Sequence, residues 1–144
     1  MIALGCDSAG FALMKDVKQH LSRKGLEYKD FGTFNEDPVD YPLYAEKVAQ
    51  SVLSGEAARG ILICGSGIGI SIAANRFVGV RCALAHDVFS AKSTRDHNDS
   101  NILALGGWVV GKGLALEIVD TWLNTPFSGE DRHQRRIDMI DAQK

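Results

Sequence analysis

The chain has 144 residues, of which 45% are apolar and 24% are charged, and its formal net charge is −2. This length suits one domain with a single hydrophobic core, and the composition excludes a disordered chain or one made of membrane spans. Because the net charge is close to zero, nothing indicates general binding to nucleic acid.

Short β-rich segments alternate with amphipathic segments along most of the chain. In chain order we expect strand 2–6, helix 13–23, strand 27–31, helix 44–53, strand 60–64, helix 68–75, strand 81–85, helix 88–95, strand 101–105 and helix 114–123. The runs 61–63 and 83–85 are apolar without alternation, as in central parallel strands covered on both faces. The pattern predicts an α/β fold in one domain over residues 1–144, a three-layer Rossmann-like sandwich with a central parallel sheet and helices on both faces.

A charged C-terminal segment, residues 128–144, follows the last predicted helix and carries the basic group RHQRR at 132–136. Charge alone favours a solvated extension. The alternative is an arm that docks on a second subunit and carries the basic group into a site.

The first residues show no basic flank, long apolar stretch or small-residue cleavage pattern, so we expect a cytoplasmic protein. Cys6, Cys64 and Cys82 are widely spaced in apolar segments, which is typical of reduced thiols. No cysteine or histidine pair has the spacing of zinc ligands, and we expect no metal site.

Parallel sheets bind ligands at the carboxyl ends of their strands, and polar and glycine residues gather after several predicted strands here. The clearest example is CGSGIGIS at 64–71, where a buried strand ends in a thiol and a glycine-rich turn leads into a helix. Backbone N–H groups of such a turn stabilise an oxyanion or phosphate beside the sulfur, and the same field favours the thiolate. An inert, buried Cys64 is an equally good interpretation of these residues alone.

Other motifs fit this turn less well. A Cys-x5-Arg phosphatase loop requires arginine where Ile70 stands, and a Walker loop requires a Gly-Lys-Ser/Thr ending. The turn also lacks the third glycine of a dinucleotide fingerprint. A nucleotide-binding module is therefore the weaker alternative.

Two further polar residues have both a functional and a structural interpretation. His97 lies in the polar run RDHN at 95–98, where it either shuttles protons in a pocket or is solvated at the surface. Asp7 follows the first strand and either binds a hydroxyl group or caps the next helix.

Several blocks of the sequence, taken together, resemble the family of type B ribose-5-phosphate isomerases and galactose-6-phosphate isomerases. They are GCDSAG at 5–10, DYP at 40–42, GILICGSGIG at 60–69, SIAAN at 71–75, RDHN at 95–98 and RHQ at 132–134. The resemblance spans nearly the whole chain. It implies an aldose–ketose isomerase of sugar phosphates without metal or organic cofactor, in a homodimer or dimer of dimers whose subunits share active sites. The C-terminal segment would then be the docking arm.

The resemblance also implies a role for individual residues. Cys64 would be the base that moves the proton through a cis-enediolate, with Ser66 and the backbone of Gly65, Gly67, Ile68 and Gly69 holding the developing oxyanion. His97 would open the cyclic sugar. The remaining substrate contacts implied are Asp7 and Asn98 to hydroxyl groups, Tyr41 closing the pocket, and Arg132, His133 and Arg136 at the phosphate, with the arginines supplied by the partner subunit.

Two positions depart from the pattern of the family, which usually has histidine after the first-strand aspartate and arginine in a Gly-Gly-Arg-Val block. Here these positions hold Ser8 and Trp108, and the tail has one extra residue in the segment 129–132. One interpretation is that ribose 5-phosphate is still the substrate. The others are a tetrose phosphate, galactose or allose 6-phosphate, another pentose, or a non-catalytic subunit that binds sugar phosphates.

Overall fold

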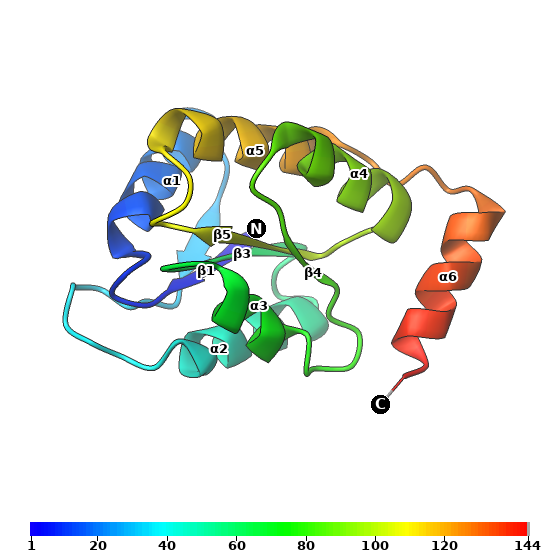
Figure 1. Cartoon of the computed structure of the whole chain (residues 1–144), viewed down its shortest axis with the longest axis horizontal. Coiled ribbons are helices and arrows are strands. Elements are labelled where there is room, and N and C mark those ends of the chain that lie inside the picture. The colour runs from blue at the N-terminus through cyan, green and yellow to red at the C-terminus, as the bar shows by residue number, and fades with distance from the viewer. Residues whose placement is uncertain (144) are drawn as a thin grey trace.

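The computed structural model describes residues 1–143, and over this range five parallel strands form one sheet in the order β2-β1-β3-β5-β4 (Figure 1). The elements in chain order are β1 (Ile2–Cys6), α1 (Phe11–Arg23), β2 (Tyr28–Asp30), α2 (Tyr41–Leu53), β3 (Arg59–Cys64), α3 (Ile68–Ala74), β4 (Cys82–Leu84), α4 (Val88–Asn98), β5 (Ile102–Gly106), α5 (Lys112–Asn124) and α6 (Asp131–Asp141). The predicted α/β sandwich is confirmed.

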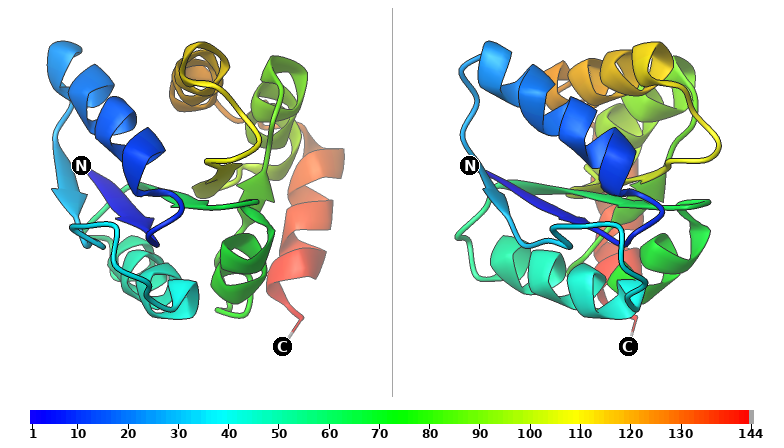
Figure 2. Two further views of the ribbon diagram at one scale, coloured as in Figure 1. Left: turned by 60° about the vertical axis from the view of Figure 1, so that its left-hand side comes forward. Right: turned by 90° about the vertical axis from the view of Figure 1, so that its left-hand side faces the viewer.

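Helices α1, α4 and α5 cover one face of the sheet, and α2 and α3 cover the other (Figures 1 and 2). Side chains alternate between these faces along β3, so Ile61 and Ile63 pack with α1 and α5, whereas Leu62 and Cys64 pack with α2 and α3. Both cores are built from apolar side chains, and burial of each fully buried Leu or Ile contributes roughly 1.5–3 kcal/mol. The reactive thiol proposed from the sequence therefore faces the α2–α3 layer.

The run 83–85 is not a central strand, contrary to the prediction from its apolar residues. β4 lies at the edge of the sheet, pairs only with β5, and leaves Leu84 38% exposed. The alanines of this run are small enough to fit an edge or a centre, so three apolar residues do not determine a strand's place in the sheet. By contrast, every residue of β1 and β5 is buried.

The C-terminal segment is more ordered than its charge suggests, because residues 131–141 form α6. This helix packs beside α4 and lies away from the sheet (Figure 1). It buries His133 and Ile137, which are four residues apart on one face, and an ion pair of 2.8 Å joins Arg81 to Asp141. The end of the predicted arm, Lys144, lies outside the described residues.

None of the helices described over residues 1–143 is both long enough and apolar enough to cross a membrane.

Candidate active site

Cys64 is the last residue of β3 and is 4% exposed. The backbone N–H of Gly67 donates a hydrogen bond of 3.2 Å to its sulfur. Gly67 makes this possible with a left-handed φ of 78°, and a Cβ there would lie 2.6 Å from the side chain of Leu84. An N–H group aimed at the sulfur stabilises the thiolate, so the turn fits a thiol that acts as a base.

Two aromatic side chains flank the glycine-rich turn. A Cβ on Gly65 would lie 2.7 Å from the indole of Trp108, and one on Gly69 would lie 2.5 Å from the hydroxyl of Tyr41. The backbone N–H of Trp108 also donates to the carbonyl of Gly65 at 3.0 Å. Tyr41 and Trp108 are both exposed, so their side chains border the turn and remain accessible to solvent.

The end of β1 brings Asp7 to the same edge of the sheet. The N–H of Asp7 donates to the carbonyl of Ile63 at 3.3 Å, and its carboxylate accepts from the N–H of Gly10 at 3.0 Å. One oxygen of Asp7 thus supports the turn before α1, but Asp7 does not cap this helix, whose N-cap residue is Gly10 and has no side-chain cap. Ser8 follows, half-buried, in the same turn.

The side chains of Ser66 and His86 also accept backbone hydrogen bonds near the carboxyl ends of the strands. The hydroxyl of Ser66 accepts from the N–H of Ile68 at 3.1 Å. Nε2 of His86 accepts from the N–H of Gly106, at the end of β5, at 2.9 Å. Burial lowers the pKa of His86, which suits a ring nitrogen that must stay unprotonated to accept.

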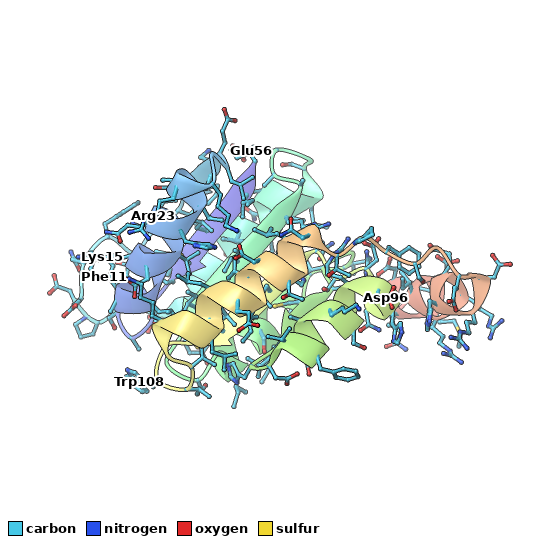
Figure 3. All side chains as sticks on the ribbon, turned by 90° about the horizontal axis from the view of Figure 1, so that it is seen from above. Phe11, Lys15, Arg23, Glu56, Asp96 and Trp108 are labelled. Carbon is cyan, nitrogen blue, oxygen red and sulfur yellow. The ribbon has the colours of Figure 1, made fainter. Side chains whose placement is uncertain are left out.

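His97 and Asn98 lie at the opposite end of the sheet from Cys64. Helix α4 starts beyond the carboxyl end of β4 and runs back, so its last residue meets the beginning of that strand. There the guanidinium of Arg81 donates to the carbonyl of Asn98 at 3.0 Å. Figure 3 shows the same separation, with Trp108 and Asp96 far apart and α6 lying beyond Asp96. Within one chain the predicted base and the predicted ring-opening histidine do not meet.

A second cluster forms where α4 meets α6. The rings of His97 and His133 stack with centroids 4.3 Å apart and an angle of 15°. Arg132 and Arg136 are exposed on the same helix, and Arg132 pairs with Glu130 at 2.9 Å. The structure thus groups four predicted site residues here, His97, Arg132, His133 and Arg136, with Asn98 next to them in sequence.

One contributor to this cluster was not predicted. The hydroxyl of Ser93 lies 3.3 Å from Nδ1 of His97, within hydrogen-bond distance. The spacing of four residues on a helix was the available signal, since residues i and i+4 share a face. Over residues 1–143, no three His, Cys, Asp or Glu side chains come together as a metal site.

Comparison with known proteins gives a consistent result across the chain. The sequence model of the Ribose/Galactose Isomerase family matches residues 2–140. Ribose-5-phosphate isomerase B of Escherichia coli (strain K12) is 49% identical over 141 residues, which cover 98% of this chain and 94% of that protein. The 4-deoxy-4-sulfo-D-erythrose isomerase of Clostridium sp. (strain MSTE9) is 41% identical over 144 residues, which cover 99% of this chain and 90% of that protein.

The fold agrees as closely as the sequence. The crystal structure of a ribose 5-phosphate isomerase from Thermotoga maritima superposes with a TM-score of 0.96 at 53% identity, covering 99% of this chain and 97% of that one. The type B ribose 5-phosphate isomerase of Trypanosoma brucei gives a TM-score of 0.96 at 43% identity, covering 99% and 97%. Identity of this extent, over both halves of the candidate site, shows that the chain belongs to the ribose/galactose isomerase family.

Proposed function

We propose that this protein is a cytoplasmic aldose–ketose isomerase that interconverts ribose 5-phosphate and ribulose 5-phosphate. The observation that carries the proposal is the thiol of Cys64 at the end of β3, with the N–H of Gly67 donating to its sulfur at 3.2 Å. Relatives that carry the name ribose-5-phosphate isomerase B, at 49% identity in one case, support this choice of substrate.

The chemistry requires one base and one group of hydrogen-bond donors. The thiolate of Cys64 removes the proton from C2 of the open-chain aldose, and the electron pair of that C–H bond forms a cis-enediolate with its negative charge on O1. The hydroxyl proton passes from O2 to the neighbouring O1, and the same sulfur returns its proton to C1, so that the C2 carbonyl of the ketose forms and the thiolate is restored. Ser66 and those backbone N–H groups of residues 65–69 that do not already donate to Cys64 or Ser66 stabilise the enediolate oxygen. Donors of this kind contribute about 3–4 kcal/mol each when they are removed singly from other enzymes.

The working unit in this proposal is a homodimer or a dimer of dimers, because one chain holds only half of the machinery. His97 of the partner subunit opens the sugar ring beside Cys64, and Arg132 and Arg136 of the partner subunit bind the phosphate. Exposed apolar side chains around α3 and β4 support a subunit interface there, since large apolar patches on a surface mark contact sites. They are Ile68, Ile72, Val78, Leu84 and Phe89.

The first test is turnover of ribose 5-phosphate by the purified protein and by its Cys64→Ala variant. We expect a fall in kcat of about 100- to 10,000-fold, the range typical of a lost acid–base group, with binding of the sugar phosphate retained. Substantial turnover by the variant would show that another group is the base. A wild-type protein that binds sugar phosphates without turning them over would instead be a non-catalytic subunit.

A second candidate substrate is a four-carbon sugar with an anionic end. Trp108 lies against Gly65, the residue after Cys64, and 82% of its surface is exposed. In this second candidate its indole shortens the space that is open to a bound sugar. One relative is an isomerase of 4-deoxy-4-sulfo-D-erythrose. Values of kcat/KM for four-, five- and six-carbon aldose phosphates decide between the candidates, and a best value for the tetrose phosphate would displace ribose 5-phosphate.

A further inference from the structure

His133 differs from every other polar residue of α6 in being buried, with 6% of its surface exposed. Its Nε2 makes no hydrogen bond within residues 1–143, and the closest acidic group, the carboxylate of Glu130, lies 3.6 Å away. What the ring does contact is His97, against which it stacks at 4.3 Å. Because the imidazole of His133 is shielded from solvent, its stacking contact with His97 is its main interaction.

His97 depends on outside contacts for its orientation. It is exposed and lies in the last turn of α4, where helices fray and side chains sample several rotamers. The Ser93 hydroxyl contacts one edge of the ring at Nδ1, and the plane of His133 contacts one face. Neither contact involves Nε2, the nitrogen that would move the proton.

The charges around the pair favour a neutral His133. Burial lowers the pKa of His133, and the neighbouring His97, Arg132 and Arg136 lower it further, against a smaller opposing effect of Glu130. From α4, the carboxylate of Asp96 lies 3.6 Å from Nε2 of His97. A neutral ring can stack on His97 in both of its protonation states, whereas a second imidazolium would repel the charged one.

We propose that His133 is a positioning residue, which holds the ring of His97 in the plane needed to open the cyclic sugar. This inference rests on the proposed function. It assigns to His133 a role through its aromatic face, in place of the phosphate contact that the resemblance implies for its nitrogen atoms.

The test isolates ring opening from isomerisation. In a Cys64→Ala background the C2 proton stays in place, and opening and reclosure of the ring appear as exchange between the α and β anomers of ribose 5-phosphate, measured by NMR magnetisation transfer. His133→Phe keeps an aromatic plane and loses the nitrogens, whereas His133→Leu keeps a buried apolar side chain and loses the plane. Gln134→Ala changes an exposed neighbour on the same helix and serves as the matched control.

We expect His133→Leu to slow enzyme-catalysed anomer exchange at saturating sugar by roughly 10- to 100-fold, as misplaced catalytic groups do. His133→Phe should stay within about threefold of the background protein, as should Gln134→Ala. Equal rates for the Leu and Phe variants would overturn the inference, and so would a loss confined to affinity for inorganic phosphate. If α6 detaches from α4 in the Leu variant, the rate of the Phe variant still tells whether the plane or the nitrogen atoms of residue 133 are needed, because Phe restores the plane alone.

A failure of the proposed function is visible separately. It would appear as absence of isomerisation in the wild-type protein, before any change at His133 is made.

Discussion

Two inactive variants, Cys64→Ala and His97→Asn, are expected to regain activity when their subunits are mixed. Each variant removes one half of the proposed machinery, and the two halves lie at opposite ends of the strands of the sheet. The six residues of β3 span about 20 Å at ~3.3 Å per residue, and the eleven residues of α4 run back about 16 Å. Proton transfer needs groups within about 3 Å of the substrate, so both cannot serve one substrate from the same chain.

The expected recovery follows from the symmetry of a dimer with shared sites. A mixed dimer has one site with both substitutions and one site with neither. Random exchange of equal amounts makes about half of the dimers mixed, so the mixture should reach about one quarter of wild-type kcat on ribose 5-phosphate. The assay is turnover after subunit exchange, with the fraction of mixed dimers measured by native mass spectrometry on isotope-labelled subunits.

A pair of variants in the same half provides the control. Cys64→Ala mixed with Cys64→Ser should recover nothing, because no site in that mixture has an intact thiol. If mixed dimers of Cys64→Ala and His97→Asn form and stay as inactive as their parents, the shared site is refuted.

Three further predictions concern single positions. Below about pH 6.5 the free energy of unfolding should fall, because His86 has a lowered pKa in the folded state and the unfolded chain takes up the proton more readily. Urea unfolding at pH 7.5 and 5.5 should show a smaller loss of this free energy for His86→Gln than for the wild-type protein. An equal loss in the two proteins would exclude His86 as the cause. Gly67→Ala should destabilise the fold by more than about 1–2 kcal/mol, because that is the cost of a φ of 78° alone and the added Cβ would also lie 2.8 Å from the backbone of Leu105. It should also weaken catalysis by moving the N–H away from the sulfur, and unchanged unfolding and kcat would contradict this account of the turn. Trp108→Arg should lower KM for phosphorylated pentoses by roughly tenfold, because the new guanidinium would make a charge-assisted contact with the phosphate. An equal fall in KM for unphosphorylated sugars would contradict a phosphate contact at this position.

The sequence predicted the sheet and its helices well because these elements carry periodic apolar patterns. It failed at β4, where alanines fit a central or an edge strand equally. It also gave no helix for residues 131–141, because most of α6 faces solvent and only His133 and Ile137 are buried. A helix held by a histidine stack and by the ion pair of Arg81 with Asp141 leaves almost no hydrophobic pattern to read.

The candidate site was predictable in its parts and not in its assembly. The turn after β3 is a local feature, since its glycines, thiol and strand are adjacent in sequence, and the structure shows the N–H donor that the glycines suggested. The block RDHN is equally local, but its position in the last turn of a helix already excludes the side of the sheet where the strands end. In a parallel sheet with crossover helices, a residue that ends a strand lies at the carboxyl ends of the strands, and a residue that ends the following helix lies at their amino ends. A motif pairing Cys64 with His97 therefore predicts two copies of the chain, and this follows from topology and not from any interface residue.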